Sequence, residues 1–331
     1  MARRTLALPH LLVAGALTLT GACAQQATVS PLAVEAPSST STTAPPTTTT
    51  TTPPPTTATV SPTTTTTAAP IDVFALRPPA AAGDPAGLVQ QIVAAEMTLR
   101  DPNATAPAVA EAALLHQVAY RQLGIHPEWD AVVLPALPEG LRGVAERNAV
   151  ARREFRAMHT RPVTKMPAWN IVAPAPLDVL VASYQEAEAT FGIPWRYLAA
   201  INLVETGLGR IRGTSSAGAQ GPMQFMPATW AAYGGGGDIN DTHDAIMGAA
   251  RYLAANNGAV DIDNALYRYN HSNNYVRGVK LYADLIAEHA QALRVFYLWG
   301  VWYATDHGDV YLPVGYAEPA PVPVADYLAR R

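Results

Sequence analysis

The sequence predicts a mainly helical protein with a short β-hairpin near its C-terminus. Apolar residues recur at helical spacing in most segments between residues 86 and 290. An aromatic, strand-like run appears only after that region, at 295–303. The first 70 residues carry almost nothing that could build a core, so about 260 residues remain for one large domain or two small ones.

The composition excludes two classes of protein. The chain has 331 residues, of which 49% are apolar and 15% charged, and its net charge is −4. Nucleic-acid binding is not expected, because the basic excess typical of such proteins is absent. Cys23 is the only cysteine in the sequence, which excludes an internal disulfide framework and a multi-cysteine metal site.

Residues 1–24 have the pattern of an export signal. Arg3 and Arg4 precede an apolar run over 6–19 that is too short to span a bilayer. Two processing outcomes stay open at the small residues that follow. In the first, the lipobox-like LTGAC is acylated at Cys23, which would attach the chain to a membrane. In the second, ordinary cleavage releases a secreted protein. We therefore expect an exported protein, either of the cell envelope or secreted.

Residues 25–70 are expected to form a disordered linker rich in threonine and proline. Between 37 and 70, 29 of 34 residues are Thr, Pro or Ser, and none is charged. Such a segment buries too little apolar surface to offset the entropy of ordering, and its prolines keep it extended. The linker would hold the folded part away from a membrane if Cys23 is acylated. Low-complexity filler without a spacing role is the alternative.

Residues 71–160 are expected to form a helical N-terminal region without a chemical motif, followed by a proline-rich connector over 161–176. Helical periodicity predicts helices at 86–100, 107–123 and 138–158. The scattered histidines favour packing or surface roles over metal ligation; they are His116, His126 and His159. We expect the helical blocks on either side of the connector to pack on each other.

Residues 177–290 are expected to form a second helical domain, and 291–331 a hairpin and tail. Apolar periodicity predicts helices at 177–190, 194–206, 227–233, 243–256, 262–269 and 273–290. Ser272 is placed to cap the last of these helices. Beyond it, strands at 295–303 and 310–314 flank the turn residues DHGD. The aromatic residues of this hairpin could stack on sugars, although core packing is their commoner role.

The helix expected at 194–206 carries the first candidate for chemistry. After its first turn it is apolar on nearly every side, which indicates a buried helix, and Glu205 lies at its C-terminal end. Apolar neighbours and the negative end of the helix dipole both disfavour the carboxylate and raise its pKa. A general acid that protonates a leaving oxygen near neutral pH needs this condition. The alternative is a solvated Glu205 where the helix frays at Thr206.

The second candidate is the segment SSAGAQGPMQFMP over 215–227, which we call the motif loop. Gly218 and Gly221 would let backbone groups come near a ligand. Gln224 can bind an amide or a hydroxyl, because its side chain both donates and accepts. A tight structural loop is the alternative, and it would need the glycines but not Gln224.

The third candidate is LYRYNHSNNYV over 266–276, where one expected helix ends and another begins. Tyr269 and Asn270 at this junction could point their polar groups into a cleft. Tyr275 would lie one turn into the next helix. Asn270 as a simple helix cap is the alternative.

Together these three segments resemble the catalytic core of the lytic transglycosylases, members of the lysozyme-like superfamily that cleave peptidoglycan. The resemblance spans residues 176–286. SxAGAxGxMQFMP is specific for the superfamily, and YNHSxxYV resembles SLT-domain enzymes and membrane-bound lytic transglycosylase B. Ser215 follows Glu205 by 10 residues, as in soluble SLT enzymes, whereas the B branch has a long insertion there. The branch therefore stays open.

The resemblance implies a lysozyme-like helical catalytic domain in which Glu205 is the sole catalytic acid and base. By the same resemblance, Ser215 would orient either Glu205 or the N-acetyl group of the substrate. The residues that would line the sugar cleft are Gln224, Tyr269, Asn270 and Tyr275. Peptidoglycan glycan strands would be the partner, and the reaction would need no cofactor.

The implied reaction cleaves the β-1,4 bond between N-acetylmuramic acid and N-acetylglucosamine and forms a 1,6-anhydro product. Two alternatives stay open. The first is a goose-type lysozyme-like hydrolase, in which Asp238 or Asp241 positions a water molecule. The second is a non-catalytic peptidoglycan-binding module.

The segment GGGGDINDTHD over 234–244 lies where some relatives carry a calcium loop. His243 occupies the position at which an EF-hand has its glycine, and no glutamate closes a twelve-residue loop. We therefore predict no metal there. We expect Asp241 or Asp244 to cap the helix that follows.

Overall fold

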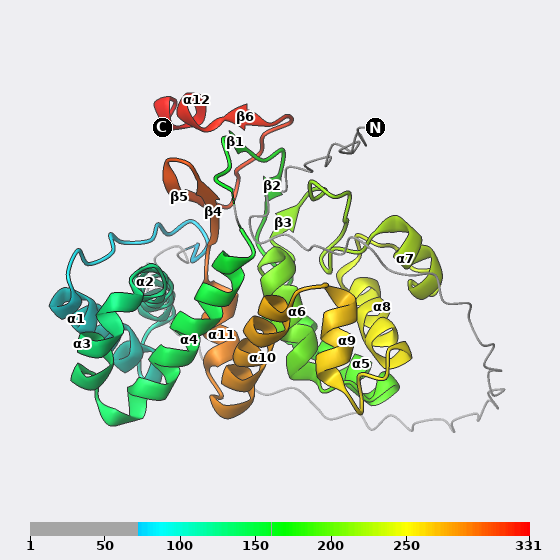
Figure 1. Ribbon diagram of the computed structural model, residues 1–331, viewed down its shortest axis with the longest axis horizontal. Helices are drawn as coiled ribbons and strands as arrows, with labels where there is room; N and C mark the ends of the chain where they lie inside the picture. Colours follow the sequence, from blue (N-terminus) through cyan, green and yellow to red (C-terminus); the bar gives the residue numbers. More distant parts are fainter. Residues whose placement is uncertain (1–71, 160) are drawn as a thin grey trace, which may run out of the picture. The chain divides into compact units, whose positions relative to one another are not determined.

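Helices dominate the computed structural model, which describes residues 72–159 and 161–331 (Figure 1). The predicted class, mainly helical with a C-terminal hairpin, is confirmed. The export signal predicted over 1–24, with Cys23, and the linker predicted over 25–70 lie outside the described residues. Within the described part of the chain, no helix combines the length and the apolar character needed to cross a bilayer.

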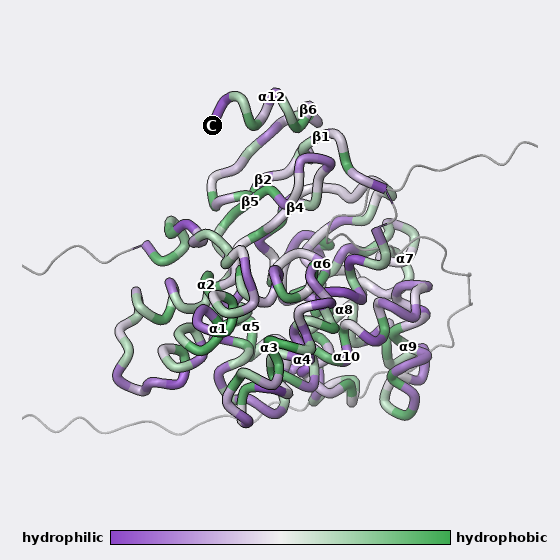
Figure 2. Tube along the Cα trace, turned by 60° about the vertical axis from the view of Figure 1, so that its left-hand side comes forward, coloured by the Kyte–Doolittle hydropathy of each residue, from purple (hydrophilic) through white to green (hydrophobic). Residues whose placement is uncertain are grey.

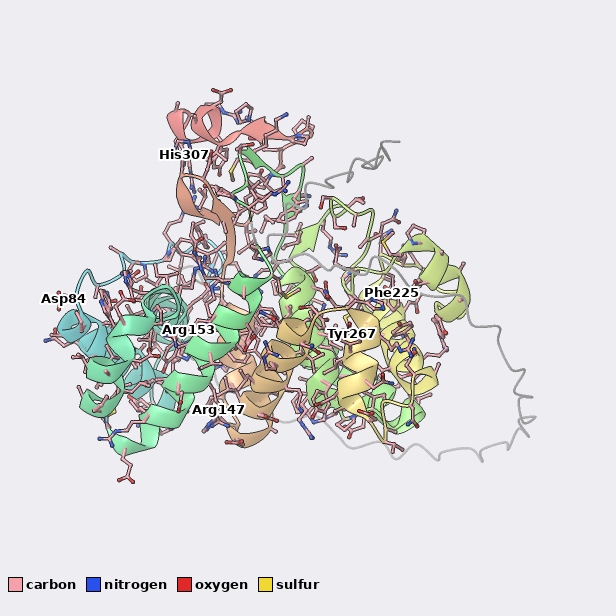
Figure 3. All side chains as sticks on the ribbon, in the orientation of Figure 1. Asp84, Arg147, Arg153, Phe225, Tyr267 and His307 are labelled. Carbon is pink, nitrogen blue, oxygen red and sulfur yellow. The ribbon has the colours of Figure 1, made fainter. Side chains whose placement is uncertain are left out.

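The N-terminal region is a group of helices packed side by side. They are α1 (Pro85–Arg100), α2 (Ala106–Ile125), the 3-10 helix η1 (Pro127–Trp129), α3 (Asp130–Ala136) and α4 (Glu139–Ala157). Asp84, labelled in Figure 3, and Thr105 fix the starts of α1 and α2 by accepting hydrogen bonds from their first turns. All three helices predicted in this region are confirmed. The sequence did not predict α3, because Pro135 interrupts its pattern.

The second helical region surrounds one central helix. Its elements are α5 (Leu177–Phe191), α6 (Trp195–Thr206), α7 (Pro227–Tyr233), α8 (Thr242–Ala255), α9 (Ile262–Tyr269) and α10 (Asn273–Glu288). Every residue of α6 from Tyr197 onward is buried, as its apolar pattern predicts, and α5, α8 and α10 pack around it. Ser272 caps α10 and Asp241 caps α8, so both predicted caps are confirmed.

The C-terminal region corrects one predicted strand. Its elements are α11 (Ala292–Leu298), β4 (Val301–Thr305), β5 (Gly308–Leu312), β6 (Val322–Pro323) and α12 (Val324–Ala329). Residues 295–298, which the sequence placed in the first strand of the hairpin, belong to α11. Leu293 and Phe296 are buried along one side of α11, so packing overrides the strand preference of this aromatic run. The hairpin itself is confirmed, with Val301 paired to Leu312 in antiparallel register.

The segment predicted as a connector, 161–176, takes part in a second hydrophobic core. Three short strands contribute, β1 (Lys165–Met166), β2 (Asn170–Ile171) and β3 (Ile211–Arg212). β1 pairs with β6 and β2 pairs with β3, in both cases antiparallel (Figure 1). Met166 and Trp169 join Val301 and Tyr303 of the hairpin in one hydrophobic cluster. This cluster ties the segment to the C-terminal tail.

The two helical regions pack on each other, as the sequence predicts. α4 lies against α10, with the Phe155 ring stacked on Tyr282 at a centroid distance of 5.7 Å (Figure 1). Gln117 of α2 bridges to the start of the hairpin, because its side chain donates to the Gly300 carbonyl (2.8 Å) and accepts from the Gly300 N–H (2.9 Å). Polar and apolar residues alternate along the helices in Figure 2, as expected for helices that bury one face.

A buried carboxylate joins α1 to α2. Glu96 is 5% exposed, and its Oε1 accepts a hydrogen bond from the Tyr120 hydroxyl (2.9 Å) and lies 3.4 Å from His116 Nε2. Its Oε2 accepts from Arg100 (3.1 Å). Burial raises the pKa of this carboxyl, but His116, Tyr120 and Arg100 together lower it to about 2. The structure thus places His116 in packing, one of the two roles predicted for it.

Glu96→Gln is expected to reduce the free energy of unfolding by about 3 kcal/mol near neutral pH. Because the folded pKa lies below the ordinary value of 4.5, this contribution is fully present above 4.5 and is lost as the pH falls toward about 2. The gap between wild type and variant should therefore close over that interval. Urea unfolding across this pH range measures it, with the exposed Glu111→Gln as the matched control. A gap that does not change with pH would contradict this assignment.

Candidate active site

Glu205 is the penultimate residue of α6 and is 1% exposed. The predicted burial of this carboxyl is therefore confirmed, and the alternative of a solvated side chain is wrong. Gly207 follows α6 in the left-handed conformation (φ 62°) and donates its N–H back to the helix. This cap ends the helix without fraying and keeps Glu205 inside the protein.

Tyr275 contacts Glu205 directly. Its hydroxyl donates a hydrogen bond to Glu205 Oε1 at 2.8 Å, across 70 residues of sequence. The Ser272 cap fixes the first turn of α10, where Tyr275 lies, by accepting a hydrogen bond from the Tyr275 N–H (3.4 Å). The Tyr275 ring is buried and nearly parallel to that of Tyr269, with centroids 6.4 Å apart, while Phe155 of α4 meets its edge. This packing limits how far the hydroxyl can move from the carboxyl.

The motif loop is anchored to α6 on both sides of Glu205. The Pro222 carbonyl accepts hydrogen bonds from Asn202 Nδ2 (2.9 Å) and from Thr206 Oγ1 (2.6 Å). The Tyr184 hydroxyl donates to Asn202 Oδ1 (2.7 Å) and so orients that amide. All of these groups are buried, where a satisfied hydrogen-bond network specifies one arrangement.

The motif loop is also anchored to α9. The Tyr269 hydroxyl donates a hydrogen bond to the Met223 carbonyl at 2.6 Å. Since Tyr269 also packs beside Tyr275, this single residue links the motif loop to the hydroxyl that contacts Glu205. Phe225 of the motif loop, labelled in Figure 3, is fully buried. Its ring meets the Tyr269 ring edge-on, with centroids 5.9 Å apart. Glu205, the motif loop and the Tyr269–Tyr275 pair therefore form one assembly.

Gln224 occupies a strained position at the centre of the motif loop. Its φ is 50°, uncommon for a residue with a side chain, and it is 1% exposed. The neighbouring residues Gln220 and Phe225 exchange two backbone hydrogen bonds of 2.9 Å, which fix the turn. The Gln224 Nε2 donates to the Gly221 carbonyl (3.0 Å), whereas its buried Oε1 has no hydrogen-bond partner among the described residues.

The two glycines of the motif loop differ in what surrounds them. Gly221 has a φ of 74°, and a Cβ there would lie 1.8 Å from the Ile239 carbonyl oxygen. The backbone group that comes close to Gly221 therefore belongs to the chain itself, not to a ligand as the sequence suggested. At Gly218, where φ is 93°, a Cβ would meet only Met226 Cε, at an ordinary contact distance of 3.9 Å.

Residues 182–285 match the family model described as transglycosylase SLT domain. The match covers less than a third of the chain, and we refer to this matched part as the SLT domain. The match runs from α5 into α10, so it contains Glu205, the motif loop and Tyr275. No curated protein and no solved structure matches the chain significantly. An SLT domain indicates an enzyme of the transglycosylase type that acts on peptidoglycan, and hence an exported protein.

Ser215 and Asn270 lie within the SLT domain, where each shapes a turn. Ser215 Oγ accepts a hydrogen bond from the Ala219 N–H (2.9 Å), and the backbones of the two residues pair as well. Asn270 ends α9 as its cap and is 2% exposed. Its carbonyl accepts from the Ser272 N–H (2.6 Å), which sets the short turn between α9 and α10. The substrate-binding roles expected for both residues stay predictions.

The sequence motifs did not identify three polar residues of the SLT domain that support the site. Tyr184, Asn202 and Thr206 carry the hydrogen bonds that hold the motif loop against α6. Asn202 is fully buried between the apolar residues Ile201 and Leu203 of α6. A polar side chain there must find a buried partner, which is the signal that could have identified it.

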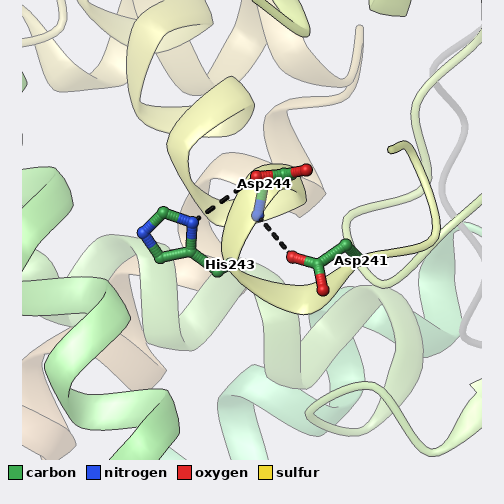
Figure 4. A group of neighbouring side chains, drawn as sticks. All are labelled: Asp241, His243 and Asp244. Carbon is green, nitrogen blue, oxygen red and sulfur yellow. Dashed lines mark hydrogen bonds and ion pairs between the residues drawn. The ribbon is translucent and has the colours of Figure 1, made fainter. Parts of the chain in front are cut away.

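Three ionisable side chains gather at the start of α8 (Figure 4). Ligand atoms of Asp241, His243 and Asp244 lie within 4.8 Å of one another, so these residues could hold a metal. The chain already uses the same atoms, because Asp241 Oδ1 accepts from the Asp244 N–H (2.9 Å), and His243 pairs with Asp244 (3.5 Å) and Glu186 (3.1 Å). The arrangement is that of a helix cap beside an ion pair. That no metal binds here stays a prediction.

Proposed function

We propose that this protein is a peptidoglycan lytic transglycosylase that cleaves the β-1,4 bond between N-acetylmuramic acid and N-acetylglucosamine and leaves a 1,6-anhydromuramic acid end. The observation that carries the proposal is the Glu205 carboxyl, buried within an SLT domain and hydrogen-bonded to Tyr275 beside the motif loop. A single carboxyl group supports this reaction because no second group has to activate water, as glycoside hydrolysis normally requires.

In the first step of the proposed reaction, neutral Glu205 gives its proton to the glycosidic oxygen. The bond from that oxygen to C1 of the muramic acid breaks, and its electron pair stays with the departing N-acetylglucosamine. Burial disfavours the charged form of a carboxyl group, which supports Glu205 as a proton donor. The N-acetyl group of the substrate stabilises the positive charge that develops at C1.

In the second step, the Glu205 carboxylate takes the proton from the C6 hydroxyl of the same muramic acid. The C6 oxygen bonds to C1 and closes the 1,6-anhydro ring, while Glu205 returns to its neutral form. Tyr275 stabilises the carboxylate between the two steps, because its hydroxyl donates to Glu205 Oε1. No water is consumed in either step.

We assign Gln224, Asn270, Ser215 and Tyr269 to the sugar cleft as parts of the same proposal. The buried Oε1 of Gln224 supports recognition of an N–H group, such as that of an N-acetyl substituent. The Tyr269 hydroxyl already donates to Met223, so this residue would act through its ring and by holding the motif loop. Ser215 Oγ already accepts from Ala219, which leaves its hydroxyl hydrogen for the substrate.

The reaction products distinguish a transglycosylase from a hydrolase and from a binding module. Mass spectrometry of purified peptidoglycan after digestion should show fragments that lack one water relative to hydrolysed fragments. Hydrolysed ends would favour a goose-type lysozyme instead, and no released fragment at all would favour a binding module. The structure gives the hydrolase no particular support, since Asp238 accepts from Asn240 within its own turn and Asp241 caps α8.

Tyr275→Phe is expected to lower the rate of glycan cleavage by about 10–100-fold, because it removes the hydroxyl that orients and stabilises Glu205. The ring contacts with Tyr269 and Phe155 remain, so the fold should be kept. Dye release from labelled peptidoglycan measures the rate. Tyr267→Phe, at a 39% exposed position on α9 (Figure 3), is the matched control. Equal rates for the two variants would remove Tyr275 from the mechanism.

We also propose the layout of the rest of the chain. Residues 1–24 would be the export signal and 25–70 the linker, followed by the helical region 71–160, the connector 161–176, the catalytic domain 177–290 and the hairpin and tail 291–331. The action of SLT domains on peptidoglycan supports export. Acylation of Cys23 would place the protein in the membrane fraction, and Cys23→Ser would then release it. A wild-type protein found only in the medium would refute the anchor.

A further inference from the structure

A cavity of about 50 Å³ lies between the N-terminal helices, α6 and the start of the hairpin. Phe155, Leu203, Val204 and Phe296 give it apolar walls, and α2 and α4 contribute polar side chains. The volume suits about four water molecules or a ligand of about four to six non-hydrogen atoms. Leu203 and Val204 face the cavity from α6, and helical periodicity points Glu205 to the opposite side. The cavity is therefore distinct from the candidate active site.

The polar end of this cavity carries more positive than negative charge. Arg121 and Arg152 line it, and together with Arg156 they surround one carboxylate, Asp309 of the hairpin. Arg152 and Arg156 approach Asp309 at 3.6 and 3.5 Å, and Arg121 makes the closest contact. Burial, followed by the neighbouring Arg152, lowers the pKa of Arg121. Three guanidinium groups thus face a single carboxylate. The cluster keeps a net positive charge, which a second anion could neutralise.

The neighbouring histidine does not change this balance. Burial, together with Arg152 and Arg156, lowers the pKa of His159 to about 4, so its imidazole is neutral near pH 7. It adds no charge to the cluster. The cationic excess therefore comes from the arginines alone.

Two residues that line the cavity each have a buried polar atom without a hydrogen-bond partner among the described residues. One is Nε of Arg152, a donor, and the other is Oδ1 of Asn148, an acceptor on a residue that is 2% exposed. The Asn148 amide is oriented by its Nδ2, which donates to the Val144 carbonyl (2.9 Å). Asn148 and Arg152 are four residues apart on α4, so they lie on the same face. A ligand that pairs with both atoms must accept a hydrogen bond from Arg152 Nε and, from a neighbouring group, donate one to Asn148 Oδ1.

We propose that this cavity binds a small carboxylate with a hydroxyl or amino group on the adjacent carbon. Its carboxylate would accept hydrogen bonds from Arg121 and Arg152, because the planar donor fork of a guanidinium group matches the two oxygens of a carboxylate. Its hydroxyl or amino group would donate to Asn148 Oδ1. Its short alkyl part would lie against Phe155 and Val204. The site goes beyond the proposed cleavage reaction and does not depend on it.

Thermal unfolding of the full chain tests the proposal with two α-hydroxy carboxylates of different size at equal sodium concentration. Racemic sodium lactate has a size that fits the cavity, whereas gluconate is about twice too large. Lactate at about 100 mM should raise Tm by about 3 °C and the rise should saturate, whereas gluconate should not. Equal shifts with both salts would overturn the proposal as a general ionic effect. This comparison uses wild-type protein alone.

Matched variants locate the binding. Arg152→Gln should abolish the rise in Tm with lactate, whereas Arg153→Gln, on the same helix but paired with Asp130, should keep it. Asn148→Ala should weaken the response to lactate but not the smaller response to acetate, which has no hydroxyl group. A full lactate response in Arg152→Gln would overturn the site. So would an Asn148→Ala response reduced equally for both anions.

Discussion

Glu205→Gln is expected to reduce peptidoglycan cleavage by about 10⁴-fold while the chain keeps its fold. General acid–base catalysis by one positioned group contributes about 10²–10⁴-fold, and the upper end is expected because Glu205 would serve both proton transfers. Glutamine has the same shape, and its oxygen can still accept the hydrogen bond from Tyr275. The free energy of unfolding should therefore change by less than about 1.5 kcal/mol.

The measurement compares anhydro-product formation and urea unfolding for the same protein samples. Glu186→Gln is the matched control, since Glu186 lies in the same domain but its side chain is 57% exposed and pairs only weakly with His243 at 3.1 Å. That control should keep full activity. Cleavage retained by Glu205→Gln would end the assignment of this residue as acid and base. Loss of both activity and fold would instead mean that the carboxyl is structural.

The burial of Glu205 could be predicted because it depends on local sequence. A helix that is apolar on all sides has to be surrounded by other elements, and the carboxyl at its end is buried with it. The caps at Ser272 and Asp241 were predictable for the same reason, since each bond spans three residues. Periodicity and capping are properties of short windows.

The contacts that complete the site could not be predicted in this way. The hydrogen bond from Tyr275 to Glu205 joins residues 70 positions apart, and that from Tyr269 to Met223 spans 46. Such pairs are set by how α6, α9 and α10 pack, and no spacing rule encodes them. The two-residue strands β1 and β6 are too short to leave a pattern, yet they pair across the chain. The resemblance to known enzymes predicted that Tyr269 and Tyr275 share one cleft, but it predicted neither hydrogen bond and nothing of the C-terminal core.

Gly221→Ala is expected to destabilise the protein by at least about 3 kcal/mol and to remove most activity. The new Cβ would lie 1.8 Å from the Ile239 carbonyl oxygen, so backbone must move on one side or the other. The positive φ of 74° adds strain of its own. Movement at Gly221 would also displace Gln224, which donates to the Gly221 carbonyl.

Gly218→Ala separates the cost of the positive φ from the cost of the close contact, within the same loop. Gly218 has a φ of 93°, but an added Cβ would make only an ordinary contact of 3.9 Å with Met226 Cε, so only the conformational cost of about 1–2 kcal/mol should appear. Urea unfolding of both variants, together with their cleavage rates, gives the comparison. If Gly221→Ala costs no more than Gly218→Ala, the turn at Ile239 yields to the methyl group and the motif loop is not held by this contact. If it costs more and activity falls with it, the close approach at Gly221 keeps Gln224 in place within the motif loop.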